Sequence, residues 1–137
     1  MSETPYLFVY GTLRAAAGTE WSQYLGACAH FVGMARTTGA LFQSREYPGM
    51  TAVAGDEDAW VRGEVYLLHD PSSTLAVLDA YEGCGPGSPL PHEFERQVVT
   101  VLLDSGQTVV AWAYIYTLDT QGMRRLASGD YFHAGNS

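Results

Sequence analysis

The stretch Thr108-Val109-Val110-Ala111-Trp112-Ala113-Tyr114-Ile115-Tyr116 decides the fold class, because β-branched and aromatic residues dominate it. Its even-numbered positions from 112 to 116 carry Trp or Tyr, and its odd-numbered positions from 111 to 115 carry Ala or Ile. Successive side chains of a strand point to opposite faces, so one face is aromatic and the other is mostly small. This pattern is typical of a curved sheet or a small barrel.

Further strand signals surround this stretch. The run Phe94–Leu103 is also β-rich, and Asp104-Ser105-Gly106-Gln107 between the two runs predicts a hairpin. The Thr-Thr-Gly before Ala40 and the sequence Tyr47-Pro48-Gly49 predict turns. Four earlier runs predict strands: Tyr6–Tyr10, Phe31–Met34, Ala40–Phe42 and Val61–His69.

One helix is predicted between Asp70 and Gly83. The aspartate suits the N-cap, the proline after it suits the first helical position, and the glycine suits the end. Leu75, Leu78 and Tyr81 keep a three-residue spacing that supports a helix up to Gly83.

The organisation of the chain predicts one α+β domain over residues 1–137, formed mostly by strands. A brief second helical pattern opens at Thr19-Glu20 and is expected to stop at Gly26. No repeat, low-complexity segment or shift in composition marks a linker.

Size and charge narrow the classes of function. The 137 residues are 47% apolar and 16% charged, which is typical of a compact domain with a core. Acidic residues number 15 against 7 basic ones, so the net charge of −8 disfavours binding to nucleic acid or to an anionic membrane surface. Every basic residue is Arg, so no Schiff base can form, and Arg or backbone N–H groups must bind any anionic ligand.

The cysteine count, the first residues and the short apolar runs favour a soluble, cytoplasmic protein. Cys28 and Cys84 are too few for a disulfide framework or a zinc site built on Cys pairs. The first residues carry no export signal, and the longest apolar run, Val109–Tyr116, is far shorter than a membrane-spanning helix. The four His are scattered, so we expect no metal site and no cofactor.

The sequence Tyr10-Gly11-Thr12-Leu13 directly follows the first predicted strand. A glycine there lets successive backbone N–H groups point at one spot, which would bind an anion without Lys. Taken by itself, this motif is better explained as an ordinary turn at the end of a strand.

Glu82 stands in the last turn of the predicted helix, at the negative end of the helix dipole, where a carboxylate is disfavoured. The dipole, burial and the nearby Asp79 would all raise its pKa and make it a usable base near neutral pH. The alternative is that Glu82 is exposed and forms an ion pair with Arg96.

Cys84 offers another nucleophile, with His92 as its base. No third group is evident to orient them, so a passive thiol is the better interpretation. The residues around it, 83–92, are rich in Gly and Pro and predict a loop beside the site.

Four motifs, in this order and spacing, resemble the gamma-glutamylcyclotransferase-like family over about Leu7 to Tyr131. In size the chain is most similar to the short gamma-glutamylamine cyclotransferase type. The chain departs from the family in having Phe94 where Tyr is frequent, and in a long loop after Glu82. The motifs are Tyr10-Gly11-Thr12-Leu13, Leu78-Asp79-Ala80-Tyr81-Glu82-Gly83, Phe94-Glu95-Arg96 and Ser128-Gly129-Asp130-Tyr131.

The resemblance implies a small mixed β-barrel with flanking helices and a cavity at one side. It also implies that Tyr10, Gly11, Thr12 and Leu13 bind the γ-glutamyl part of a small-molecule substrate, and that Glu82 is the catalytic residue.

The expected reaction is intramolecular. The α-amine of a γ-glutamyl amine or peptide attacks its own γ-carbonyl, which closes 5-oxoproline and expels an amine, with Glu82 as general base and then acid. Tyr116 and Arg96 are expected to line the substrate site. Two alternatives remain: a binding module for a small carboxylate without catalysis, and a hydrolase that depends on Cys84.

Overall fold

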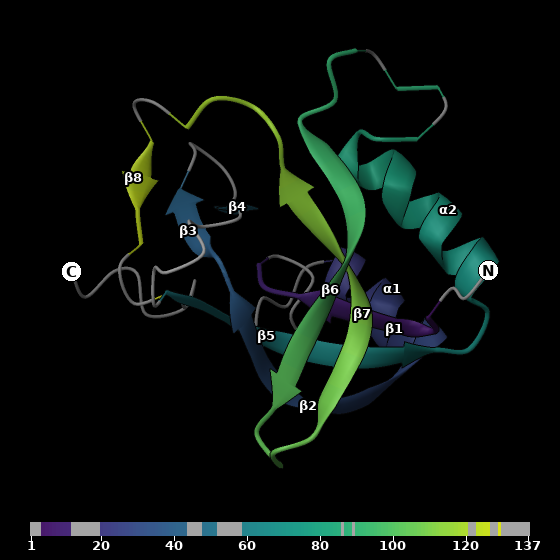
Figure 1. The fold of residues 1–137 in the computed structure, drawn as a ribbon. Helices are drawn as coiled ribbons and strands as arrows, with labels where there is room; N and C mark the ends of the chain where they lie inside the picture. Colours follow the sequence, from purple (N-terminus) through teal and green to yellow (C-terminus); the bar gives the residue numbers. More distant parts are fainter. Residues whose placement is uncertain are drawn as a thin grey trace.

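The structure is a computed structural model that describes residues 4–11, 20–43, 48–51, 59–85, 87–88, 90–120, 123–126 and 129. Neither helix in these ranges has the length and hydropathy that crossing a membrane requires. The elements, coloured in chain order in Figure 1, are β1 (Tyr6–Val9), α1 (Glu20–Cys28), β2 (Ala29–Thr38), β3 (Ala40–Gln43), β4 (Pro48–Thr51), β5 (Trp60–Leu68), α2 (Pro71–Glu82), β6 (Phe94–Leu103), β7 (Thr108–Tyr116) and β8 (Arg124–Arg125).

Five strands form a closed barrel in the order β1-β5-β2-β6-β7, and a pairing of β1 with β7 closes it. The closing pair is parallel, with Leu7 beside Trp112, whereas the other barrel pairs are antiparallel. Beyond β7 the sheet continues through β4 and β3 to β8. Figure 1 shows α2 running beside the barrel rather than through it. The predicted fold class, an α+β mixed barrel with flanking helices, is confirmed.

The alternation along β7 separates two hydrophobic clusters. Ala111 and Ala113 are fully buried in the cluster formed by the barrel strands, together with Phe8 and Val65. Tyr114 is buried in a second cluster, which also contains residues of both helices. Small side chains leave room where strands curve around a narrow interior, so the pattern correctly predicts the barrel.

Helix α2 begins and ends as its sequence predicts. The Asp70 side chain accepts a bond from the Ser73 N–H at 3.5 Å, and Gly83 ends the helix with a left-handed φ of 77°. Of the three residues that keep the helical spacing, Leu75 and Leu78 are buried, whereas Tyr81 is 37% exposed. A strict three-residue spacing rotates off the buried stripe of a helix that has 3.6 residues per turn.

The structure corrects three other boundaries. Pro48-Gly49 begins β4 rather than a turn, while Tyr47 lies outside the described residues. Gly49 allows this strand to lie against Tyr116, because a Cβ there would come within 2.9 Å of the Tyr116 side chain. Helix α1 continues past Gly26 to Cys28. Thr37 and Thr38 are the last residues of β2 rather than part of a turn, so only Gly39 separates β2 from β3, and these two strands do not pair.

Candidate active site at the C-terminal end of helix α2

The candidate site forms where α2 ends, with Asp79 and Glu82 one turn apart on the same face of the helix. The Gly83 N–H bonds to the Ala80 carbonyl at 3.2 Å, and the Cys84 N–H bonds to the Asp79 carbonyl at 2.9 Å. These bonds satisfy carbonyls of the last turn and stop the helix at Glu82. The Glu82 carboxyl is therefore held at the negative end of the helix dipole.

Glu82 is partly buried, and its surroundings favour the uncharged form of its carboxyl group. Burial, and then the negative charges of Glu93 and Asp79, raise its pKa from 4.5 to about 7. Within the part of the chain that the structure describes, no hydrogen bond or ion pair holds its carboxylate. A carboxyl with this pKa is present in both protonation states at neutral pH, so it can take up a proton in one step and return it in the next.

Strand β1 brings Tyr10 to the same site. Tyr10 is buried, and its hydroxyl donates to the Tyr114 carbonyl at 2.7 Å and accepts from the Met50 N–H at 3.1 Å. Burial raises the pKa of Tyr10 far above its ordinary value, and the charge of Glu82 also contributes to this rise. The residue that opens the first motif and the glutamate of the second motif are therefore electrostatic neighbours.

Gly11 follows Tyr10 and is buried against β4. A Cβ at this position would lie 2.6 Å from Cγ of Pro48, so only a residue without a side chain fits without a shift. The other two predicted loop residues, Thr12 and Leu13, lie outside the described residues.

Arg96 pairs with Asp79, not with Glu82. Its Nε and Nη2 donate to the two carboxylate oxygens of Asp79 at 2.8 and 3.1 Å, and its guanidinium carbon lies 4.3 Å from the centre of the Trp112 ring. The Tyr114 hydroxyl donates to Asp79 Oδ1 at 2.7 Å. A substrate that used Arg96 would therefore compete with an internal carboxylate or bind at Nη1.

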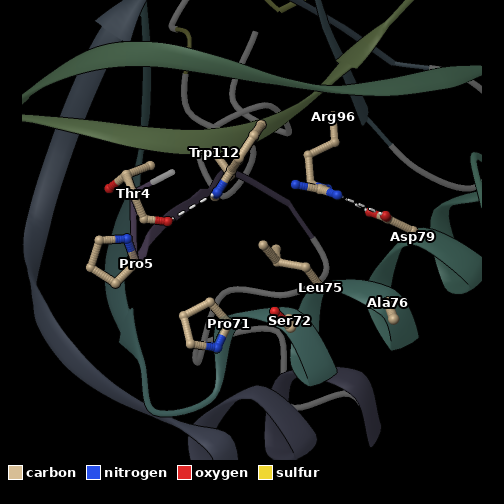
Figure 2. A pocket seen from close by; sticks show the side chains of 9 residues that line it. All are labelled: Thr4, Pro5, Pro71, Ser72, Leu75, Ala76, Asp79, Arg96 and Trp112. Atoms are coloured by element: carbon tan, nitrogen blue, oxygen red, sulfur yellow. Dashed lines mark hydrogen bonds and ion pairs between the residues drawn. The ribbon is translucent and has the colours of Figure 1, made fainter. Parts of the chain in front are cut away.

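A pocket of about 590 Å³ lies along the preceding turns of α2, on the same side as Arg96 (Figure 2). Among the predicted site residues in the described ranges, only Arg96 lines it, and Glu82 lies one turn beyond the last lining residue of the helix. The lining residues are Thr4, Pro5, Pro71, Ser72, Leu75, Ala76, Asp79, Arg96 and Trp112.

Comparison with known proteins assigns the chain to a family. A family model described as "Gamma-glutamyl cyclotransferase, AIG2-like" matches residues 7–133. The chain belongs to this family. It is 31% identical over 132 residues to the gamma-glutamylcyclotransferase family protein YtfP of Escherichia coli K12, across 91% of this chain and 94% of that one. It is 32% identical over 117 residues to the gamma-L-glutamyl-butirosin B gamma-glutamyl cyclotransferase of Niallia circulans, across 84% and 69% of the two chains.

The solution structure of YtfP from Escherichia coli shares the fold, with a TM-score of 0.64 at 27% identity over 92% of this chain and 95% of that one. The family predicted from the four motifs is thus confirmed by both sequence and structure.

In this gamma-glutamyl cyclotransferase family member, Tyr116 lies near Glu93, the acidic residue that also raises the pKa of Glu82. Burial raises the pKa of Tyr116, and the charge of Glu93 raises it further. The Tyr116 ring meets the Phe94 ring edge-on, with centroids 5.4 Å apart. Phe94 therefore packs directly against a predicted site residue.

Cys84 is poorly suited to the alternative role of a nucleophile in this family member. Burial and the charges of Asp79 and Glu82 raise the pKa of its thiol to about 11. A cysteine nucleophile acts as the thiolate, which this environment disfavours.

Among the described residues, no group of three His, Cys, Asp or Glu side chains could hold a metal ion.

The sequence interpretation missed the roles of Tyr114 and Trp112. Their alternation with Ala signalled a strand but not the contacts of their polar atoms. In the register of the hairpin, Tyr114 lies opposite Arg96, so both side chains point to Asp79 on the helix. This pairing across β6 and β7 was the signal that could have identified them.

Proposed function

We propose that this protein is a gamma-glutamyl cyclotransferase that releases 5-oxoproline and a free amine from a γ-glutamyl amine or peptide. The observation that carries the proposal is Glu82, a partly buried carboxyl with a pKa of about 7 whose charge acts on Tyr10 at the end of β1. Family membership supports the same type of reaction. The Niallia circulans relative, whose name specifies a γ-glutamyl compound, supports this class of substrate.

The reaction needs only proton transfers from the protein. The α-nitrogen of the substrate attacks its own γ-carbonyl carbon, a C–N bond closes the five-membered ring, and the bond to the leaving amine breaks. The α-nitrogen passes from an ammonium group to the ring N–H and so loses two protons, one before the attack and one after it, while the leaving nitrogen gains one to depart as an amine. Glu82 takes up a proton from the α-nitrogen and supplies one to the leaving nitrogen, so it ends the cycle in its starting state, and the remaining proton passes to solvent.

We assign the γ-glutamyl group to the loop Tyr10–Leu13. The chain has no Lys, and ion pairs already engage Arg62 and Arg96 among the described residues. Backbone N–H groups that begin at Gly11 are then suitable donors to a substrate carboxylate or to the oxyanion that develops at the γ-carbonyl. Tyr116 would help to hold the substrate in its folded, cyclising conformation, which lowers the entropic part of the barrier.

The test is 5-oxoproline release from a panel of γ-glutamyl compounds with different leaving amines. Glu82→Gln keeps the size of the side chain but removes the base, so we expect kcat to fall by about 10²-fold to 10⁴-fold. Glu95→Gln makes the same substitution at an exposed position of β6 and serves as the matched control. Full activity of Glu82→Gln would refute the assignment of the base. Thermal stabilisation by these ligands without turnover would instead indicate a binding module.

A further inference from the structure

Asp79, which lies one helical turn before Glu82 on α2, forms an ion pair with Arg96. The contact is bidentate, at 2.8 and 3.1 Å, which is the arrangement that best fixes a guanidinium group. The Trp112 ring supports the guanidinium from a second side, at 4.3 Å. The Tyr114 hydroxyl, at 2.7 Å, fixes Asp79 itself.

We propose that Asp79 is a positioning residue for the cyclisation: it holds the Arg96 guanidinium against Trp112, away from the Glu82 carboxylate, and so keeps Glu82 available as the base. This inference rests on the proposed function for its catalytic consequence. Its electrostatic part, the charge state of Glu82, can be measured without any turnover.

The surroundings of Glu82 show what this arrangement achieves. No positively charged group is among those that act on its pKa. Two of the groups near it are acidic, and the others are tyrosines and a cysteine, which are uncharged at neutral pH and whose pKa values burial raises further. These groups are Asp79 on α2, Glu93 before β6, Cys84 after α2, Tyr10 after β1 and Tyr114 on β7.

Loss of the Asp79 charge would release Arg96 beside a carboxylate that has no other ion-pair partner in the described ranges. Residues three apart on a helix are neighbours, and an arginine side chain is long enough to turn from one to the other. An opposite charge within about 4–6 Å lowers the pKa of a carboxyl by about 1–3. Glu82 would then be ionised but weakly basic, and its proton transfer would be slower.

Four variants distinguish this role from a purely structural one, in which the ion pair between Asp79 and Arg96 only attaches α2 to β6. Asp79→Asn keeps the shape of the side chain and its acceptor for Tyr114, but loses the charge. Arg96→Met keeps an unbranched side chain over Trp112 and removes the cation. The double variant removes both charges. The pair Asp104→Asn and Arg62→Met is the control, because it removes an exposed bidentate ion pair, with contacts of 2.6 and 2.7 Å, in another part of the fold.

The measurements are the titration of the Glu82 side-chain carboxyl by ¹³C NMR, assigned by its loss in Glu82→Gln, and the pH profile of kcat/KM. We expect Asp79→Asn to lower the Glu82 pKa by about one pH unit or more. We expect Arg96→Met to raise it, because the negative charge of Asp79 then acts on Glu82 without a cation paired to it. In the double variant the pKa returns towards the wild-type value, and the acidic limb of kcat/KM follows in each case. The control pair leaves both readings unchanged.

An unchanged pKa in Asp79→Asn would overturn the inference, as would a double variant that behaves like Asp79→Asn. If Asp79→Asn fails to fold, the upward shift in Arg96→Met still decides the matter, because its absence refutes the proposed electrostatics. Wild-type protein that releases no 5-oxoproline from any substrate would refute the proposed function, whereas the NMR pattern tests Asp79 independently.

Discussion

Replacing Glu82 with glutamine is expected to stabilise the protein at alkaline pH and to leave its stability at pH 4 nearly unchanged. The folded protein holds the pKa of Glu82 at about 7, against an ordinary value of 4.5. Between these two values the folded state binds more protons than the unfolded state, so stability falls as pH rises through this window. One pH unit is worth about 1.4 kcal/mol, so the ionised Glu82 costs roughly 3 kcal/mol above pH 7.

Urea unfolding of the wild-type and Glu82→Gln proteins at intervals from pH 4 to pH 9 measures this cost. The difference in the free energy of unfolding between the two proteins is expected to grow from near zero at pH 4 to roughly 3 kcal/mol at pH 8. Glu95→Gln accounts for the loss of a carboxylate at an exposed position. A difference that stays constant across the series would show that the Glu82 pKa is not raised, and the electrostatic argument for this base would fail.

Three further predictions concern the surroundings of Glu82. Gly11→Ala places a Cβ 2.6 Å from Cγ of Pro48 and is expected to cost about 1–3 kcal/mol in urea unfolding and to reduce 5-oxoproline release. Tyr10→Phe removes the 2.7 Å bond to the Tyr114 carbonyl in a buried position, so unfolding should become easier by about 1–3 kcal/mol, and a wild-type melting temperature would contradict this. Cys84→Ser should retain activity, and iodoacetamide at pH 7.5 should react slowly with Cys84 because its pKa is about 11; rapid inactivation would contradict both expectations.

Local chemistry predicted the elements whose signals lie close together in sequence. Helix α2 begins after the N-cap Asp70 and ends at the left-handed Gly83, as expected. The turn through Gly106, which has a φ of 98°, forms the predicted hairpin. The signals failed where a distant segment decides the conformation. Pro48-Gly49 suggests a turn, yet it forms a strand, because Gly49 lets the chain pass against Tyr116.

The candidate site, like the fold, could be predicted from local sequence only in part. The position of Glu82 at the end of a helix predicted a raised pKa, and the structure shows that direction. The partner of Arg96 could not be predicted, because Asp79 and Glu82 share a helix face and either carboxylate was a reasonable candidate. The pairing of β6 with β7 decides it, since it places Arg96 opposite Tyr114, whose hydroxyl also bonds to Asp79.

The sequence by itself determined the alternation that forms the barrel, the two ends of α2, the family and the absence of any lysine to bind an anion. These properties depend on residue type and on short spacing, so they can be read from neighbouring positions. Only the tertiary structure decided which charges surround Glu82. Burial and Coulomb interactions depend on distances between segments, and the closed barrel sets those distances by bringing β1, the end of α2 and the β6–β7 hairpin together.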